Sequence, residues 1–165
     1  MEDDNRYLLY PVGRYIAIKN FIDQEIQFIP FPAQIEELKC MKLSYDQKTL
    51  AISYTTKADS IPYLTLFTLG KKKEKERTFR HHDTKSSHFQ TFQFSHDSRL
   101  LCLLTNEPDY QLLYLDFQRM KIVGCLNIQK PVNRIAINPK ESHFVVISGE
   151  NFLKFYKVRE NSVYV

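Results

Sequence analysis

The stretch Phe92–Leu103, FQFSHDSRLLCL, occurs in related form at Met41–Ile52, MKLSYDQKTLAI, and at Ile135–Val146, IAINPKESHFVV. Each copy begins with two apolar residues separated by one other residue, continues through a polar turn opened by Ser or Asn, and ends in a second apolar run. Short apolar runs on either side of a tight polar turn are typical of a β-hairpin. The three copies therefore predict similar hairpins and, because they repeat, an all-β repetitive architecture.

The spacing of the copies predicts a β-propeller. With Leu43, Phe94 and Ile137 taken as equivalent positions, the copies are 51 and 43 residues apart. The second spacing falls within the roughly 40–45 residues of a WD-type propeller blade, and the first exceeds it by the length of a loop insertion. Each unit is expected to be a four-stranded antiparallel meander. Further strands are expected at 63–69, 110–116 and 151–157, with fourth strands at 121–126 and 76–80.

The domain organisation follows from these units. Three shorter segments before the first copy, at 6–10, 14–19 and 25–31, also have the character of strands. Residues 33–39 are interpreted as a connection rather than a helix, because two apolar residues three apart are weak evidence of helical periodicity. We expect residues 1–165 to form a single partial propeller domain: an incomplete blade at 6–31, a blade at 35–80 with a basic insertion at 70–85, a blade at 88–128 and an incomplete blade at 132–158.

The net charge is concentrated in one segment. The 165 residues carry a formal charge of +4, and residues 69–85 hold seven basic residues against three acidic ones, so the rest of the chain is neutral. This segment is interpreted either as a solvated loop or as a contact for an acidic surface. Nucleic acid is the weaker target, because no aromatic residue interleaves the basic run to stack on bases. The predicted partner-binding residues are Lys71, Lys72, Lys73, Lys75, Arg77 and Arg80.

Cysteine usage and hydropathy indicate where the chain resides. Cys40, Cys102 and Cys125 are odd in number, far apart and embedded in apolar stretches, so we expect reduced, buried thiols in an intracellular protein. The acidic first six residues lack the apolar core of a secretory signal. The densest apolar run, Leu100 to Leu104, is far shorter than a bilayer span. We expect neither secretion nor membrane insertion.

The sequence offers no positive feature of an enzyme, a metal site or a cofactor site. Ser95-His96-Asp97 contains the residue types of a nucleophilic triad, but adjacent residues in a tight turn cannot form the required relay. His81, His82, Asp83 and His88 are possible metal ligands, yet their spacing on a polar insertion gives no framework for a tetrahedral site. With only 4 Gly, no phosphate-binding loop is formed.

The copies resemble WD repeats, in which an apolar-Ser-Pro-Asp-Gly turn joins the first two strands and a Trp-Asp pair closes the third. The turns here are Ser44-Tyr45-Asp46, Ser95-His96-Asp97 and Asn138-Pro139-Lys140, and the positions of the Trp-Asp pair hold Phe67-Thr68, Leu115-Asp116 and Tyr156-Lys157. The chain has no Trp, and His81-His82 stands only roughly where the family has a Gly-His pair. The resemblance implies the propeller fold, but not the buried Asp–His network of regular blades.

A closer resemblance covers roughly residues 6–158. Tyr10-Pro11-Val12-Gly13, Phe28-Ile29-Pro30, the run 45–53 and the run 94–101 resemble, in this order, the N-terminal propeller region of the cilia- and flagella-associated protein 57 family. That resemblance implies a non-enzymatic scaffold of the cytoplasm and cytoskeleton, located in the axoneme of motile cilia near inner dynein arms. Implied partners are dynein-arm or radial-spoke base components, other WD-repeat or coiled-coil proteins, and the microtubule surface. The family's second propeller and long coiled coil are not in this sequence.

The strand count bears on function as well. Fourteen expected strands make three and a half blades, whereas closed propellers have about four to eight blades. Unpaired strand edges are covered or paired in natural proteins, so the chain is either a segment of a longer protein or a short paralogue completed by a partner strand. Residues expected at such edges, or on the apolar faces beside them, are Leu8, Ile16, Ile18, Phe152, Phe155 and Tyr156.

Two other functions remain open from the sequence. One is a cytoplasmic WD-repeat adaptor outside cilia, and the other is an RNA- or ribosome-associated factor that uses the basic loop at 71–85. Strong salt dependence of RNA binding would favour the second of these.

Overall fold

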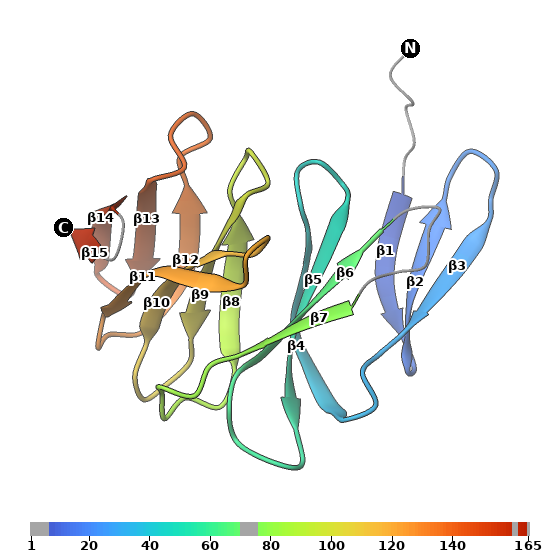
Figure 1. Ribbon diagram of the computed structural model, residues 1–165, viewed down its shortest axis with the longest axis horizontal. Helices are drawn as coiled ribbons and strands as arrows, with labels where there is room; N and C mark the ends of the chain where they lie inside the picture. The colour runs from blue at the N-terminus through green and yellow to red at the C-terminus, as the bar shows by residue number, and fades with distance from the viewer. Residues whose placement is uncertain (1–6, 70–75, 160–161, 165) are drawn as a thin grey trace. The chain divides into compact units, whose positions relative to one another are not determined.

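A computed structural model describes residues 7–69, 76–159 and 162–164, and every regular element within these ranges is a β-strand. The all-β prediction is therefore confirmed. Four antiparallel sheets follow one another along the chain (Figure 1). The first contains β1 (Tyr7–Val12), β2 (Tyr15–Asn20) and β3 (Ile26–Pro30). The second contains β4 (Ile35–Leu43), β5 (Thr49–Thr56), β6 (Tyr63–Thr68) and β7 (Glu76–Arg80).

The remaining two sheets have the same meander topology, with each strand hydrogen-bonded to the next one in sequence. The third sheet contains β8 (Phe89–Phe94), β9 (Leu100–Thr105), β10 (Gln111–Asp116) and β11 (Lys121–Asn127). The fourth contains β12 (Val132–Ile137), β13 (Phe144–Gly149), β14 (Phe152–Arg159) and β15 (Ser162–Tyr164). The chain divides into two compact units, Met1–Ile35 with the first sheet and Glu36–Val165 with the other three.

Two elements differ from the sequence-based expectation. Residues 33–39 were expected to be a connection, but β4 begins at Ile35, so most of this stretch belongs to a strand. Its first half was missed because the apolar positions Ile35, Leu38 and Cys40 do not keep a strict two-residue alternation. The short strand β15 was not expected, and it pairs with the end of β14 through Lys157 and Tyr164. The fourth strand expected at 76–80 is present as β7, and the basic insertion placed at 70–85 therefore contains a strand.

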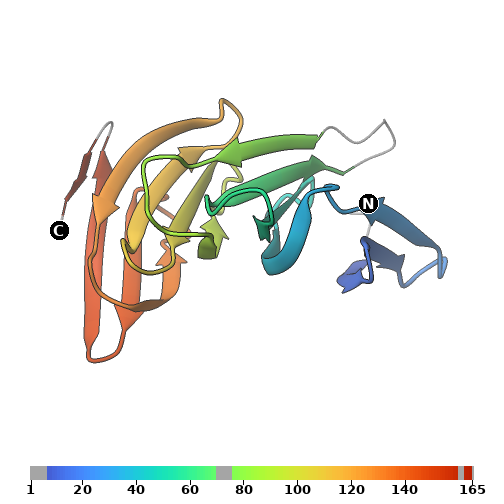
Figure 2. The same ribbon diagram turned by 90° about the horizontal axis from the view of Figure 1, so that it is seen from below.

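The third sheet is the centre of the second unit because both of its faces are buried. Along β9, Leu101 and Leu103 pack towards the second sheet, whereas Cys102 and Leu104 pack towards the fourth. Successive side chains of a strand point to opposite faces, so a strand covered on both sides needs a continuous apolar run. This explains the sequence LLCLLT of β9. Figure 2 shows the third sheet lying between its two neighbours.

The sheet-to-sheet interface on the β4–β7 side is rich in aromatic residues. Phe89, Phe92 and Phe94 of β8 are all at most 1% exposed and pack with Leu64 and Leu66 of β6. Burying a side chain of this size contributes about 1.5–3 kcal/mol relative to leaving it in water. Polar bonds also join these two sheets; within the apolar interface the Ser53 hydroxyl donates to the Phe89 carbonyl at 2.9 Å.

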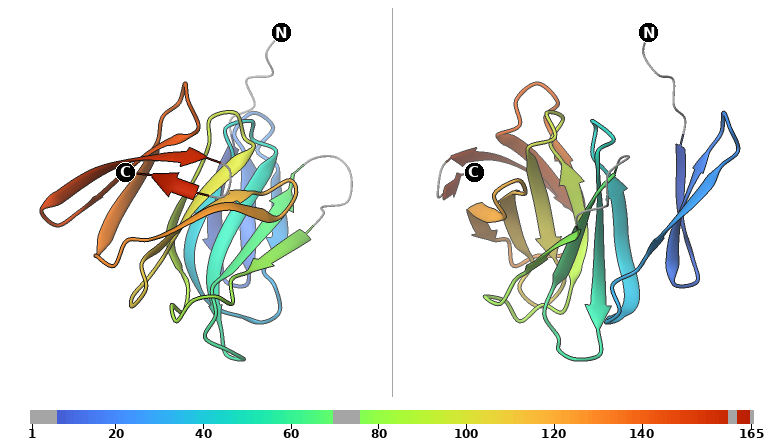
Figure 3. Two further views of the ribbon diagram at one scale, coloured as in Figure 1. Left: turned by 60° about the vertical axis from the view of Figure 1, so that its left-hand side comes forward. Right: turned by 45° about the vertical axis from the view of Figure 1, so that its right-hand side comes forward.

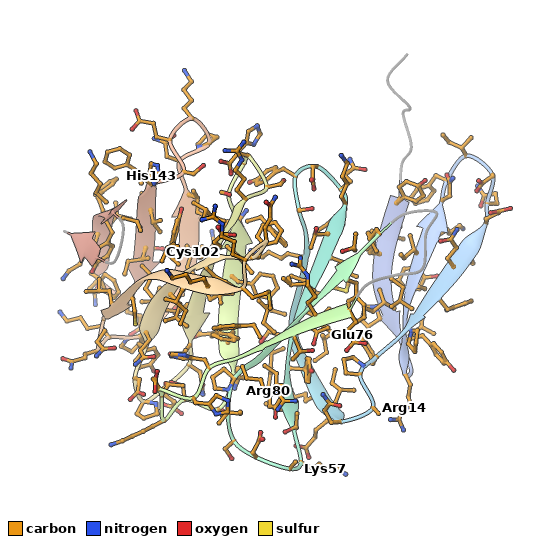
Figure 4. All side chains as sticks on the ribbon, viewed as in Figure 1. Arg14, Lys57, Glu76, Arg80, Cys102 and His143 are labelled. Carbon is orange, nitrogen blue, oxygen red and sulfur yellow. The ribbon has the colours of Figure 1, made fainter. Side chains whose placement is uncertain are left out.

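The three cysteines lie in different environments. Cys102 is fully buried, and desolvation raises the pKa of its thiol well above the ordinary value. Figure 4 shows Cys102 inside the second unit, among the strands of the third sheet. Cys40 is half-buried, but Cys125 is exposed on β11, so the expectation that all three are buried is wrong for Cys125. The reason is that β11 is an edge strand with side chains that face solvent.

Candidate functional site

The repeated turns gather at one end of the second unit. Figures 1 and 3 show the turns at 44–48, 95–99 and 138–143 at the same end of their hairpins. In the third-sheet turn, the buried Ser95 hydroxyl donates to Asp97 Oδ1 at 2.6 Å and accepts the Leu100 N–H at 2.9 Å. Asp97 Oδ1 in turn accepts the Arg99 N–H at 3.2 Å. The side chains therefore satisfy backbone donors that the turn leaves without strand partners.

The turn of the second sheet is built in the same way. Ser44 Oγ donates to Asp46 Oδ1 at 2.6 Å and accepts the Thr49 N–H at 3.0 Å. Gln47 has a φ of 58° and Ser98, its equivalent in the third sheet, a φ of 53°. Both stand where a WD-type turn has glycine, the residue that reaches this left-handed region most readily. The second and third sheets therefore have turns with the same side-chain hydrogen bonds and the same backbone conformation, as their similar sequences predict.

Two neighbouring turns contact each other directly. The Asp46 N–H donates to Ser98 Oγ at 3.1 Å, and the rings of Tyr45 and His96 lie 4.8 Å apart. Gln93 adds a bridge, because its amide donates to the Tyr45 hydroxyl at 3.1 Å and accepts from Lys42 Nζ at 2.9 Å. Tyr45 is nevertheless 52% exposed. The turns thus form a continuous surface with an aromatic residue held in place by its neighbours.

The fourth sheet joins this surface through its own turn. Asn138 takes the role of the serine and aspartate, since its Oδ1 accepts the N–H groups of Lys140 at 2.9 Å and Glu141 at 3.3 Å. The hydroxyl of Tyr114, on β10, donates to the Ser142 carbonyl and so connects the third sheet to this turn. Burial raises the pKa of Tyr114, which keeps its hydroxyl protonated and able to donate. We define the three turns together as the turn face.

The turn face does not contain a nucleophilic relay. The Ser95 hydroxyl donates to Asp97 rather than to His96, and the His96 ring packs on Tyr45 instead. This agrees with the interpretation of Ser95-His96-Asp97 as a turn, because a triad needs the imidazole between the hydroxyl and the carboxylate. Among the described residues there is also no group of three or more His, Cys, Asp or Glu side chains placed to hold a metal.

The connection at 81–88 is anchored at His81 and Ser86, which are buried, whereas His82, Asp83 and Lys85 are exposed. The interpretation of the whole basic segment as a solvated loop is therefore wrong for the anchored residues. His81 is 4% exposed, and its Nε2 lies 2.6 Å from Gln111 Oε1. The Gln111 side-chain amide donates to the Asp83 carbonyl at 3.1 Å, and its backbone N–H donates to Thr105 Oγ1 at 2.8 Å. A buried polar network therefore exists, but a glutamine rather than an aspartate partners the histidine.

The other end of this connection is anchored by the turn between β9 and β10. Asp109 Oδ2 accepts the Lys85 N–H at 2.6 Å and the Thr84 hydroxyl at 2.8 Å, and these bonds lower the pKa of the carboxyl. The Ser87 and His88 N–H groups both donate to Asn106 Oδ1. The sequence could not show this packing, because the partners lie about twenty residues away in the chain.

Only part of the predicted basic surface lies within the described residues. Lys71, Lys72, Lys73 and Lys75 fall outside them. Arg77 is half-buried on β7 and donates through Nη1 to the Gln118 carbonyl at 3.0 Å. Arg80, labelled in Figure 4, lies over the ring of Tyr63 with 5.2 Å between its guanidinium carbon and the ring centroid. Both arginines make intramolecular contacts that sequence reasoning did not anticipate.

The predicted edge residues divide into exposed and buried groups. Leu8 is 47% and Phe155 is 63% exposed, whereas Phe152 is half-buried and packs beside the core of the fourth sheet. Ile16 and Ile18 are buried and belong to β2, the middle strand of the first sheet, so they do not lie at a sheet edge, and Tyr156 is buried in the core between the third and fourth sheets. The exposure expected for these three is therefore corrected.

Sequence reasoning missed several residues of the turn face. Tyr45 and His96 occupy the same position of two repeat copies, between the Ser and the Asp of the turn, so the repeat alignment could have indicated their proximity. Outside the turn face, Arg119 and Lys157 line one cavity together with His143 of the third turn, and no comparable signal exists for these three, which come from different segments. Figure 4 shows His143 at the end of the turn that precedes β13.

Within the described ranges, the chain has no helix of the length and apolar character that a membrane crossing requires.

Comparison with known proteins identifies the fold and a relative. No family model matches the chain. Over 165 residues it is 24% identical to cilia- and flagella-associated protein 57 of Mus musculus, with 97% of this chain matched. The match spans only 13% of the length of that mouse protein. The predicted resemblance to a WD-repeat region of this kind of protein is confirmed.

Solved structures support the same fold. The β-propeller domain of Cps50 (Swd1) from Myceliophteria thermophila superposes with a TM-score of 0.72 at 13% identity, covering 93% of this chain and 50% of that one. A protein of unknown function from Desulfotomaculum acetoxidans superposes with a TM-score of 0.70 at 15% identity, covering 92% of this chain and 46% of that one. The chain thus has a partial β-propeller fold and spans about half of each of these structures.

Proposed function

We propose that this chain is a non-enzymatic WD-repeat module that mediates protein–protein contacts in the axoneme of motile cilia. The observation that carries the proposal is the match of 97% of the chain to a mouse protein that is named for its association with cilia and flagella. The turn face supports an interaction role, because it offers exposed aromatic and charged side chains on a rigid scaffold of paired strands.

Within the axoneme, we place the module near inner dynein arms and their regulatory complexes on doublet microtubules. Its partners there are dynein-arm or radial-spoke base components and other WD-repeat or coiled-coil proteins. The support for this placement is the ordered set of motifs at 10–13, 28–30, 45–53 and 94–101 that resembles the family.

Retention in the axoneme tests this proposal. A tagged copy is expressed in cells with motile cilia, the cilia are isolated, and the membrane and matrix are removed with detergent. We expect the tagged protein to remain with the doublet microtubules, and its absence from the extracted axonemes would overturn the ciliary assignment. A release into the cytoplasmic fraction together with normal folding would instead support an adaptor that acts outside cilia.

The basic run is a second element of the proposal. Lys71, Lys72, Lys73 and Lys75 give the chain its net positive charge, and tubulin-type acidic surfaces attract such a run at low salt. Replacing the four lysines by Gln is expected to weaken co-sedimentation with microtubules while the thermal melt is unchanged. A matched control replaces four exposed lysines elsewhere by Gln: Lys57, Lys121, Lys130 and Lys154. Equal binding by both quadruple variants would contradict a specific role of the run.

A further inference from the structure

The large apolar side chains that the fold leaves exposed are concentrated in two sheets. Among the described residues they lie in the first sheet with its β2–β3 turn and on β14 of the fourth sheet, and Tyr45 of the turn face is the exception. Contiguous apolar surface is rarely left open to water on a soluble protein, and it marks a place of contact. The first and fourth sheets are therefore the candidates for contact with another molecule.

The exposed residues of the fourth sheet share the face that points away from the third sheet. The opposite face is buried against the third sheet through residues that include Val145, Ile147 and Tyr156. Successive residues of a strand alternate between faces, so Val146 and Phe155, which pair between β13 and β14, point away from that core, as does Leu153. Leu153 is 60% and Phe155 is 63% exposed. This fourth-sheet face includes a hollow of about 460 Å³, lined mainly by Ala136, Ile137, Pro139, Phe144, Val146 and Phe155.

The first sheet also has one buried and one exposed apolar face. Ile16 and Ile29 pair between β2 and β3, and both are at most 1% exposed. Tyr15 and Phe28 alternate with them and therefore lie on the other face, where their rings meet edge to face at 6.1 Å between centroids. They are 48% and 56% exposed. The strand register adds three exposed apolar residues to this first-sheet face: Leu8, Val12 and Ile26.

The extent of the chain favours a second copy as the occupant of both faces. The solved propeller structures that superpose on it are about twice as long, since it covers 50% of one and 46% of the other. Four sheets from each of two copies make eight, and closed propellers have about four to eight blades. A second copy also carries both faces. The contact can therefore be made twice, with the roles of the copies exchanged, as in the closed two-fold dimers that soluble proteins form most often.

We infer that two copies of this chain associate, with the fourth-sheet face of each packed on the first-sheet face of the other. Phe155 of one copy then lies against Tyr15 and Phe28 of the second, and these side chains leave water together. Apolar faces of neighbouring sheets already meet in this way between the third and fourth sheets of one chain. Lys157, whose Nζ lies 4.9 Å from the centroid of the Phe144 ring, keeps its ammonium at the border of the contact. The inference goes beyond the proposed function, because it concerns how the chain assembles with itself.

Sedimentation velocity of the purified 165-residue chain, over a wide range of concentrations, tests the inference. We expect a species with twice the 19.6 kDa mass of one chain, which dissociates on dilution. Phe155→Lys and Phe28→Glu should each weaken dimerisation by about tenfold or more, because each places a charge in an apolar contact. The matched controls are Tyr45→Lys and Tyr45→Glu. Tyr45 is 52% exposed but lies on the turn face, so the same changes there should leave the dimer intact.

A mixture of the two variants distinguishes this contact from other ways of pairing. When a Phe155→Lys chain pairs with a Phe28→Glu chain, one of the two contacts keeps both original faces and the other sets Lys against Glu. We therefore expect the mixture to dimerise more tightly than either variant alone. A dimer of two fourth-sheet faces would instead be insensitive to Phe28→Glu and would not be restored by mixing, and that result would overturn the inference.

Circular dichroism of each variant checks its fold, and Leu153→Lys or Tyr15→Glu replaces a variant that unfolds. The inference is also overturned if the original chain stays monomeric at every concentration, if it forms assemblies larger than two copies, or if Phe155→Lys and Tyr45→Lys dimerise equally. These results leave the axonemal retention of the tagged chain untouched, because retention is measured separately in ciliated cells. Loss of retention with a normal dimer would instead contradict the ciliary assignment alone.

Discussion

Replacement of Ser95 by Ala tests whether the side-chain bonds of the repeated turn hold the hairpin together. Ser95 is fully buried, and its hydroxyl is the acceptor for the Leu100 N–H at 2.9 Å and the donor to Asp97 Oδ1 at 2.6 Å. The substitution leaves the Leu100 donor without that partner, which costs about 1–3 kcal/mol, and removes the bond to Asp97, which adds about 0.5–1.5 kcal/mol. We expect a total loss of about 1.5–4.5 kcal/mol in the free energy of unfolding.

The assay is urea unfolding followed by circular dichroism, with thermal melting as a second measurement. For a chain of this size, each kcal/mol shifts the melting temperature by about 2–4 °C, so the expected decrease is roughly 3–18 °C. Ser44→Ala removes the equivalent bonds in the second sheet and should have a similar effect. His96→Ala, at the exposed neighbouring position, should change stability by no more than about 0.5 kcal/mol. If Ser95→Ala and His96→Ala unfold at the same urea concentration, the reasoning about the turn is refuted.

Three further predictions follow from buried groups. Gln111→Leu removes the hydrogen-bond partner of His81 and of the Asp83 carbonyl, so it should lower the free energy of unfolding by about 2–4 kcal/mol. Gln118→Leu is the control: it changes an exposed side chain and should leave the midpoint of urea unfolding almost unchanged. Iodoacetamide at mildly alkaline pH should modify Cys125 before Cys102, since Cys125 is exposed whereas Cys102 is buried with a raised pKa; equal rates, measured by mass spectrometry, would contradict the described packing. Because the folded-state pKa of Cys102 lies above the ordinary value of 9.0, its contribution to stability is present below pH 9.0 and is lost as the pH rises above it. Urea unfolding of the original chain should therefore become easier above that pH, and Cys102→Ala should reduce this dependence.

The repeat pattern was sufficient to predict the hairpins because their turns are local. Ser95, Asp97 and Leu100 are within six residues of one another, so a short motif determines both the strand ends and the hydrogen bonds that close the turn. The strand β7 could be located only with doubt, because Glu76–Arg80 is charged and its place is decided by pairing with β6. The anchoring of the connection at 81–88 was missed for the same reason, since Asn106, Asp109 and Gln111 hydrogen-bond to its polar groups.

The sequence by itself determined the all-β class, the four-stranded unit and the resemblance to a WD-repeat region, because these depend on repeats and on the alternation of apolar residues along a strand. Tertiary structure alone decided which charged residues are available for a partner. Arg77 is engaged by the Gln118 carbonyl, Arg119 Nε lies 3.7 Å from Asp116 Oδ2, and Lys157 Nζ lies 4.9 Å from the centroid of the Phe144 ring. The physical reason is that a cation's availability depends on the groups that surround it in space, and those come from other strands.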